Sequence, residues 1–519
     1  MAVALLRLRP RPKFVIALFA CVLILLLSTA FYASDTESLV AEWTLKNPSS
    51  IHLDTEATPR PEGTCSPDEY AQGQWVQSSY KTRPGPLSKP ISSDGQVEVL
   101  DNTTATPEKM SAKEDLLRYA RMNACASGDN FWWQFAAVKE EQWDRFPRVF
   151  DWEWVPGGRC TQESGLREWV AEEVVRELVE GGGWLLIGGQ VLFLSLRITL
   201  TRLDSVTGNH FFSLSCLLYP HVVINKATSN ARDRPQDLYL NPSSPLVGNL
   251  RLPDGFNMTT TPLVSFRRVD LLWSVEDLAL MHTELHPEFY IANTTFELFG
   301  KEPVWSSSPD VYFDAFLGSL PTANYKAMIV STAGHWTTNL FAGYHRAQGS
   351  DKSTLPVDSA PESLDIDAVS DELEPMLGYD GLLVFFEEVM ARWALAIQDR
   401  LKTSLESTST PQQQVLVRAY LPGHDACHNE RDPWVEIKAE RSFSYNWGEI
   451  PKYNEIWETL LSQQSTSYPN IHYLGIDRPG RLRPDGHVAT DCLHIMTGPG
   501  VLEGWSHYIW HYITKEVLQ

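Results

Sequence analysis

Short apolar runs that alternate with helical segments are the feature that most restricts how this chain can fold. The runs lie at 184–188, 327–330, 415–421 and 471–476, and the first ends in glycine, as buried strands that enter tight turns often do. Helical patterns are expected at 166–180, 371–401, 453–461 and 502–517. This alternation predicts an α/β fold with a mainly parallel sheet, whose active site would lie at the carboxyl ends of the strands.

A second constraint is the uncharged apolar run at 14–33. Its length matches the roughly 20 residues that a helix needs to cross a bilayer. Basic residues precede the run and acidic residues follow it, which orients the short N-terminus toward the cytosol. The alternative, a cleaved signal peptide, has a shorter apolar core of about 7–15 residues. We therefore expect a cytosolic tail at 1–13, a transmembrane signal anchor at 14–33, a stem at 34–64 and a lumenal domain at 65–519.

The charge of the chain limits its partners. Lys and Arg number 43 and Asp and Glu number 65, so the formal charge is 43 − 65 = −22, which argues against nucleic acid as a partner. The 18 tryptophans and 18 tyrosines suit either sugar stacking or core packing. The acidic segment at 347–375 lacks aromatic residues and is expected to be a solvated loop.

Cysteines and sequons fit an oxidising compartment. Outside the predicted anchor there are six cysteines, an even number that predicts three disulfides among 15 possible pairings: Cys65, Cys125, Cys160, Cys216, Cys427 and Cys492. Asn102, Asn257 and Asn293 begin glycosylation sequons.

Candidate catalytic residues follow the first and the last of the predicted strands in the sequence. Asp491 and His494 are three residues apart, so the carboxylate could hold the imidazole in the tautomer that accepts a proton from a serine. The alternative is a helix cap followed by a surface histidine. Ser205, preceded by Asp204 and followed by a helical segment, is the candidate nucleophile.

The order of these motifs resembles a known group. A strand, Gly-Asp-Ser, a helix and a downstream Asp-x-x-His form the layout of the GDSL or SGNH serine hydrolases. More narrowly, the chain resembles the trichome-birefringence-like, or PC-esterase, family through a series of motifs between Cys65 and Gln519. These are Cys65 with 73–76, 152–156 before Cys160, 212–218, 334–336, 485–487 and 491–494.

The resemblance implies an SGNH-like three-layer sandwich and a single-pass type II membrane protein of the Golgi or secretory pathway. It implies O-acetylation of a polysaccharide or glycan through an acetyl-serine intermediate, with Ser205 as nucleophile, His494 as base and Asp491 as its orienting carboxylate. The donor would be acetyl-CoA or an acetylated carrier, with no bound cofactor or metal. The implied oxyanion and substrate residues are Gly188, Asp204, Gly334, His335 and Trp336, and the implied disulfides are Cys65–Cys160, Cys125–Cys216 and Cys427–Cys492.

Two departures from the family pattern are present. Residues 189–203 separate Gly188 from Asp204, and their removal restores a continuous Gly-Asp-Ser. We interpret this insertion as a retained intron or gene-model error. In the second departure, Thr332 stands where the family has asparagine, so backbone N–H groups would have to form the oxyanion hole.

Other functions remain open at this stage. A carbohydrate acetylesterase would use the same triad with water as acceptor, and a non-catalytic glycan-binding membrane protein is favoured if the insertion is genuine. The cluster His424, Asp425, Cys427 and His428 contains zinc-ligand types, although a lumenal cysteine is better used in a disulfide. Anionic sugars or phosphates could bind Arg267 and Arg268, or the arginines at 478, 481 and 483, if these are not simply solvated charges.

Overall fold

The computed structural model describes residues 65–79, 108–128, 130–163, 165–189, 206–224, 236–290, 296–345, 376–407, 413–439, 446–463 and 465–517. All of them belong to one compact unit, Glu62–Gln519. The predicted tail, anchor and stem lie outside the described residues, as do Asp204, Ser205, Asn102, Asn293 and the acidic segment. Within the described part of the chain, no helix has both the length and the apolar character needed to cross a bilayer.

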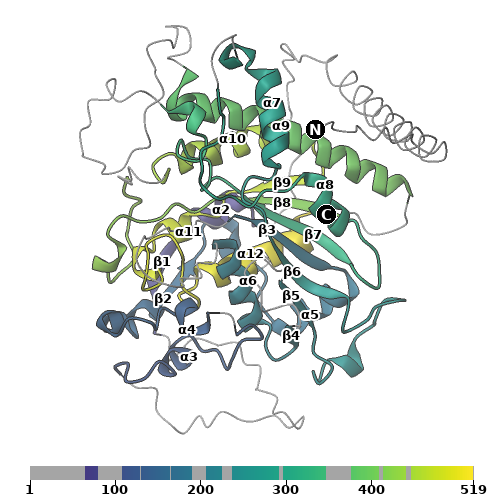
Figure 1. Ribbon diagram of the computed structural model, residues 1–519. Helices are drawn as coiled ribbons and strands as arrows, with labels where there is room; N and C mark the ends of the chain where they lie inside the picture. Colours follow the sequence, from purple (N-terminus) through teal and green to yellow (C-terminus); the bar gives the residue numbers. More distant parts are fainter. Residues whose placement is uncertain are drawn as a thin grey trace, which may run out of the picture. The chain divides into compact units, whose positions relative to one another are not determined.

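Seven described strands form one sheet in the order β4-β5-β6-β3-β7-β8-β9 (Figure 1). Its parallel part contains the strands β6 (Pro262–Arg268), β3 (Gly183–Gly188), β7 (Tyr325–Ser331), β8 (Gln414–Arg418) and β9 (Ile471–Leu474). Four of these correspond to the predicted runs, and the α/β class is confirmed.

One side of the sheet departs from the parallel arrangement. Strands β4 (Val222–Ile224) and β5 (Gln236–Leu240) pair antiparallel, and β5 pairs antiparallel with β6. The apolar pattern did not reveal β6 because Ser265 interrupts it. Ser265 is nevertheless buried, and its hydroxyl hydrogen-bonds to Asp237 and, at 2.6 Å, to the hydroxyl of Tyr325. A partnered hydroxyl can occupy a core strand at little cost, so the missed strand has a simple physical reason.

Side chains of the central strand alternate between two apolar layers. Leu185 and Ile187 belong to a buried cluster formed with the helices between β6 and β9, whereas Trp184 and Leu186 belong to one formed with the helices that flank β3 in the sequence and the last helix of the chain. Because successive side chains of a strand point to opposite faces, helices cover both faces of the sheet (Figure 1).

Four of the larger helices correspond to the predicted segments, with shifted ends: α5 (Ala171–Glu180), α9 (Gly378–Ser407), α10 (Ile450–Gln463) and α12 (Val501–His511), which continues into a π-helical turn at Tyr512–Glu516. Helix α6 (Val206–Leu217) is the helical segment expected after Ser205, whereas α7 (Val275–Leu285) and α8 (Pro309–Phe316) were not predicted. Helix α5 starts later than predicted. The backbone N–H groups of Leu166 and Arg167 bond instead to Cys160 O and His511 Nδ1, and Val170 is extended.

Shorter elements surround the sheet. They are α2 (Pro67–Ala71), α3 (Asp115–Tyr119), α4 (Phe131–Gln134), α11 (Arg478–Arg481) and the two-stranded sheet of β1 (Gln74–Gln77) and β2 (Trp152–Val155). The indole of Trp75 in β1 donates to Pro479 O at 2.9 Å, which fastens this small sheet near α11. The structure joins Cys65 to Cys160, Cys125 to Cys216 and Cys427 to Cys492, the same pairs that the resemblance implies.

Candidate active site

The candidate site lies where the strand order of the sheet reverses. Strand β3 comes first along the parallel part, and the chain then adds β6 on one side and β7 on the other. At such a switch point the loops after the strands diverge and leave a crevice at the carboxyl edge. Gly188 at the end of β3 therefore occupies the position where a ligand is expected.

Helix α6 begins directly beside the end of β3. A Cβ atom added to Gly188 would lie 2.1 Å from Thr207 Oγ1, so only glycine permits this approach. The chain thus leaves the sheet at Gly189 and returns at Val206 next to the point of departure. Asp204 and Ser205 lie outside the described residues, but a peptide bond joins Ser205 to Val206, the first residue of α6.

Asp491 and His494 form the carboxylate–imidazole pair that their spacing suggested. Asp491 Oδ1 lies 2.8 Å from His494 Nδ1 and also accepts the backbone N–H groups of Leu493 and His494, at 3.1 and 3.0 Å. Burial acts to raise the pKa of the Asp491 carboxyl, but the facing imidazole and these hydrogen bonds outweigh it and hold the pKa well below its ordinary value. The carboxylate is therefore ionised wherever the protein is folded under physiological conditions.

His494 is fully buried, which contradicts the alternative of a helix cap followed by a surface histidine. The pair lies in a turn rather than a helix. The ring of Trp133 packs edge-on against the His494 imidazole with 5.3 Å between centroids, and its indole N–H donates to Thr490 Oγ1 at 2.7 Å. Within the described part of the chain, His494 Nε2 has no hydrogen-bond partner. A buried imidazole with one orienting carboxylate and one open nitrogen has the arrangement of a general base.

Asn209 connects helix α6 to the wall that holds His494. It is buried on α6, and its side-chain amide donates to Gln134 Oε1 at 2.6 Å. Gln134 follows Trp133 directly, and its backbone carbonyl accepts the Thr497 N–H at 2.8 Å. The sequence interpretation missed Asn209. Its position four residues after Ser205 in the sequence was the available signal, since such spacing brings side chains to one face wherever the chain is helical.

Buried charged side chains support the turn that contains Asp491 and His494. Arg483 forms a two-pronged ion pair with Asp485, and both side chains are fully buried. Arg145 donates to the backbone carbonyls of Asp485 and His487, at 3.1 and 2.8 Å. The motif at 485–487 is thus a scaffold for the turn, because every charge in it points into protein rather than into the site.

Two histidines complete this scaffold. His424 Nδ1 lies 2.6 Å from His487 Nε2, and His487 Nδ1 lies 3.1 Å from the carbonyl oxygen of His494. Burial lowers the pKa of His424 to about 4 and that of His487 well below its ordinary value. The sequence did not predict that either histidine supports the Asp491–His494 pair, because residues far apart in the sequence make these contacts.

Asp270 and His335 meet at the ends of β6 and β7, across the end of β3. His335 Nε2 lies 3.7 Å from Asp270 Oδ2. Asp270 is held in place by Trp305, whose backbone N–H donates to Asp270 Oδ2 at 2.8 Å. Thr332, in the place of the family asparagine, donates its hydroxyl to the Asp270 backbone carbonyl at 2.8 Å. Thr332 thus joins two loops and does not supply an oxyanion donor.

The structure corrects the expectation for Trp336. This side chain is fully buried, stacks on Phe341 with 4.7 Å between centroids and packs edge-on against Phe386. A sugar cannot reach it, so Trp336 is a core residue. Gly334 is tightly placed, since a Cβ atom there would lie 2.2 Å from the hydroxyl of Tyr420. That close approach explains the glycine without a role in binding.

The structure argues against the zinc site considered for the cluster at 424–428. Cys427 and Cys492 lie near His428, but their sulfur atoms are bonded to each other. A disulfide sulfur is not the thiolate that zinc requires. His424, the outer member of that cluster in the sequence, faces His487 instead.

Four of the five arginines considered for anions are engaged within the protein. Arg267 forms an ion pair with Asp237 at 2.8 Å, and Arg268 lies over the Trp305 ring, 3.1 Å from its centroid, with Asp270 at 3.7 Å. Arg483 is buried with Asp485, and Arg481 lies 3.6 Å from Asp477. These four arginines therefore already face carboxylates inside the protein, and Arg478 is half-buried.

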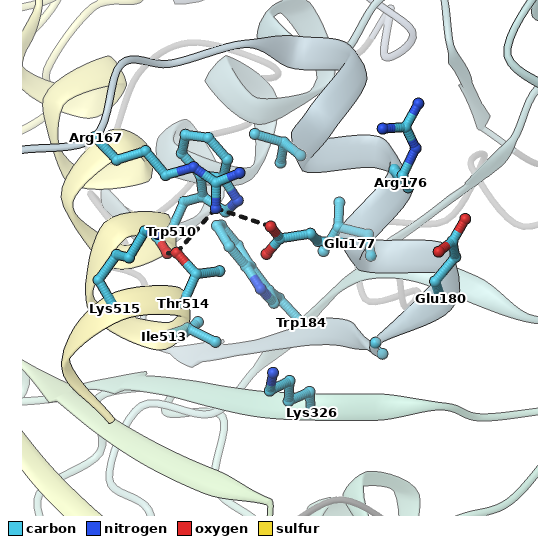
Figure 2. A pocket seen from close by; sticks show the side chains of 14 residues that line it. Arg167, Arg176, Glu177, Glu180, Trp184, Lys326, Trp510, Ile513, Thr514 and Lys515 are labelled. Atoms are coloured by element: carbon cyan, nitrogen blue, oxygen red, sulfur yellow. Dashed lines mark hydrogen bonds and ion pairs between the residues drawn. The ribbon is translucent and has the colours of Figure 1, made fainter. Parts of the chain in front are cut away.

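A pocket of about 480 Å³ lies at the opposite, amino end of the strands (Figure 2). Its wall includes Gly182 and Lys326, beside the starts of β3 and β7, together with Trp184 and Trp510. Figure 2 shows Arg167 at its rim bonded to Glu177 and Thr514. This pocket contains none of the candidate catalytic residues, so its volume does not identify the active site.

Comparison with known proteins adds no assignment: no family model, no curated protein and no solved structure matches the chain.

Proposed function

We propose that this protein is an O-acetyltransferase that acts on polysaccharide or glycan hydroxyl groups through Ser205, His494 and Asp491. The proposal includes an SGNH-like fold and membership of the PC-esterase-like group whose motifs the sequence resembles. The single observation that carries it is the buried His494. Asp491 fixes one of its ring nitrogens, and the other nitrogen has no partner among the described residues.

The position of α6 supports the choice of nucleophile. Ser205 precedes the first residue of a buried twelve-residue helix that begins at the end of β3. The N–H groups of a first helical turn have no partners within the helix and favour negative charge. An oxyanion formed at a carbonyl attacked by Ser205 would thus develop beside donors already in place.

The reaction would proceed in two steps. Ser205 Oγ attacks the acetyl carbonyl of the donor, its proton passes to His494 Nε2, and the departing donor group takes that proton when the donor bond breaks. A sugar hydroxyl then attacks the acetyl-serine and gives its proton through His494 to Ser205 Oγ as the serine ester bond breaks. The serine is regenerated, and the acetyl group ends on the sugar.

Donor, compartment and topology follow from the same proposal. The donor is acetyl-CoA or an acetylated carrier, and it acts as a substrate rather than a bound cofactor. Residues 14–33 anchor the chain as a single-pass type II protein of the Golgi or secretory pathway. The three disulfides support a lumenal domain, since such bonds persist in oxidising compartments.

Mass spectrometry of the protein with and without 189–203, after brief exposure to 4-nitrophenyl acetate, tests the nucleophile. We expect an acetyl group on Ser205 in a chain lacking 189–203, and none in its Ser205→Ala variant. His345→Ala is a matched control, because His345 is exposed and lies outside the site. Acetylation that persists without Ser205 would refute the assignment.

The same experiment separates the alternatives. An acetylesterase would lose its acetyl group to water at the same rate with or without a sugar, whereas a transferase would lose it faster when a sugar is present. A chain that is never acetylated, with or without the insertion, would indicate a glycan-binding protein instead.

A further inference from the structure

The short helix α4 contacts both halves of the proposed site. Its first residue, Phe131, packs edge-on against Phe212 of α6, with 5.8 Å between the ring centroids. Its third residue, Trp133, packs against the His494 imidazole and donates its indole N–H to Thr490. Helix α4 therefore connects the helix that follows the proposed nucleophile to the turn that carries the proposed base.

Gln134, the last residue of α4, makes both kinds of contact by itself. The residue is buried, and its side-chain Oε1 accepts a hydrogen bond from Asn209 Nδ2 of α6 at 2.6 Å. Its backbone carbonyl accepts the N–H of Thr497, three residues after His494, at 2.8 Å. Together with Trp133, Gln134 therefore holds the chain on both sides of this histidine.

A single side-chain hydrogen bond orients Asn209 within the described part of the chain. The side chain is fully buried on the first turn of α6, and its Oδ1 has no partner among the described residues. Loss of the Gln134 acceptor would leave both polar atoms of this buried amide unsatisfied, so the amide would have to move toward other partners. Because Asn209 completes the first turn of α6, that movement would displace the N–H groups proposed as oxyanion donors.

The backbone is tightly constrained on both sides of α4. Asn130 precedes the helix with a φ of 50°, and Ala136 follows it with a φ of 57°. Residues other than glycine seldom adopt this left-handed conformation, and surrounding contacts must enforce it where they do. Helix α4 is therefore a rigid spacer between α6 and the turn, and a change at its contacts is transmitted rather than absorbed.

We infer that Gln134 and Asn209 are positioning residues whose hydrogen bond sets the distance between the start of α6 and His494 Nε2. This inference rests on the proposed function and adds two residues to the three that the proposed function uses. Neither side chain exchanges a proton or contacts the acetyl group. Their hydrogen bond acts on the rate of the chemical step and not on the affinity for the donor.

The rate of serine acetylation by 4-nitrophenyl acetate, followed by mass spectrometry, tests this role. The parent protein is the form that is acetylated, with or without 189–203. Gln134→Met preserves the approximate size of the side chain but removes the acceptor. We expect the acylation rate constant of the folded variant to fall at least about tenfold, because small displacements of reacting groups are costly, while the half-saturating ester concentration changes by less than about twofold.

A second buried glutamine–asparagine pair provides a matched control. Gln398 of α9 donates to Asn470 Oδ1 at 2.9 Å and accepts the Asn470 backbone N–H at 3.1 Å, and both residues are buried. Gln398→Met should lower Tm but leave the acylation rate of the folded protein unchanged. If Gln134→Met slows acylation no more than Gln398→Met does, the role of Gln134 is structural only and the inference is wrong.

Exchange of the two side chains keeps the test informative if Gln134→Met does not fold. Asn209→Gln lengthens one partner by a methylene group and Gln134→Asn shortens the other, so each single variant should slow acylation. The double variant preserves the combined length and should acylate faster than both single variants, since residues in contact act non-additively. A double variant no faster than the better single variant would contradict the inference.

The outcomes distinguish this inference from the proposed function. An unchanged acylation rate in Gln134→Met, or a loss confined to a higher half-saturating concentration, would overturn the positioning role and leave Ser205 as nucleophile. Absence of acetyl-Ser205 in the parent protein, with and without 189–203, would overturn the proposed function on which the inference rests.

Discussion

At the scale of single residues, the Asp491 carboxylate determines how His494 can act. Its one oxygen Oδ1 contacts the imidazole and two backbone N–H groups, so it sets both the shape of the turn and the tautomer of the ring. Asparagine at this position preserves the size of the side chain but removes the charge. The Asp491→Asn variant therefore tests the orientation of His494 separately from the folding of the turn.

For activity, we expect Asp491→Asn to lower turnover by roughly 10³–10⁴-fold, because the amide can donate to Nδ1 and favour the wrong tautomer. Steady-state acetyl transfer in the full chain measures this. A loss of less than tenfold would contradict the role given to Asp491.

For stability, Asp491→Asn should change how the free energy of unfolding depends on pH. The pKa of Asp491 is depressed in the folded state, so its charge stabilises the fold fully above the unfolded pKa of about 4, and that contribution is lost as pH falls below about 4. The free energy of unfolding of the parent protein should therefore fall more steeply between pH 4 and pH 2 than that of Asp491→Asn. Urea unfolding at several pH values measures the difference, and parallel curves would contradict it.

At the scale of elements, the disulfide Cys427–Cys492 holds the turn that contains Asp491 and His494 against the loop after β8. Its partners are 65 residues apart, and the backbone carbonyl of Cys492 also accepts the His424 N–H at 2.9 Å. Replacing both cysteines with serine should lower the free energy of unfolding by about 4 kcal/mol, through the added entropy of the unfolded chain.

The double variant Cys65→Ser, Cys160→Ser is the matched control, since its partners are 95 residues apart. We expect a similar loss of stability from both variants, but loss of serine acetylation in the folded fraction only when Cys427 and Cys492 are replaced. Equal activities of the two folded variants would show that the disulfide does not position the turn.

The insertion at 189–203 lengthens the connection between two elements, β3 and α6. Because Gly188 contacts Thr207, the two residues Asp204 and Ser205 are enough to connect β3 to α6 when 189–203 are deleted. Shortening this connection from 17 residues to two should stabilise the fold by about 2 kcal/mol through loop-closure entropy. Thermal unfolding of both forms tests this, and a lower melting temperature after deletion would indicate that the insertion packs as part of the fold.

At the scale of the whole molecule, the proposed topology places every described residue in the lumen. Asn257 is exposed in the turn before β6, and Thr259 of its sequon donates its hydroxyl to Asn257 Oδ1 at 2.7 Å. We expect a glycan at Asn257 when the full chain is expressed in a eukaryotic secretory pathway. Peptide-N-glycosidase should increase its electrophoretic mobility, and Asn257→Gln should remove that part of the shift. A chain that enters microsomes but carries no glycan at Asn257 would contradict this prediction.

Much of the fold could be predicted from local pattern. The buried strands at 184–188, 327–330, 415–421 and 471–476 are visible because a strand covered on both faces is apolar at every position. The pattern failed for β6, where buried Ser265 is made acceptable by partners on β5 and β7. It also failed for β4, since three residues are too few to show a period.

The sequence by itself determined the class of fold, the short-range pair Asp491 and His494, and the strand that ends at Gly188, because each depends on neighbours a few residues apart. Only the tertiary structure decided that His494 is buried against Trp133, that Trp336 belongs to the core, and that Asp270 and His335 meet over the end of β3. Asp270 and His335 are 65 positions apart in the sequence, His494 and Trp133 are more than 300 apart, and Trp336 packs on Phe386 from another element, so only the packing of strands, helices and loops brings these residues together.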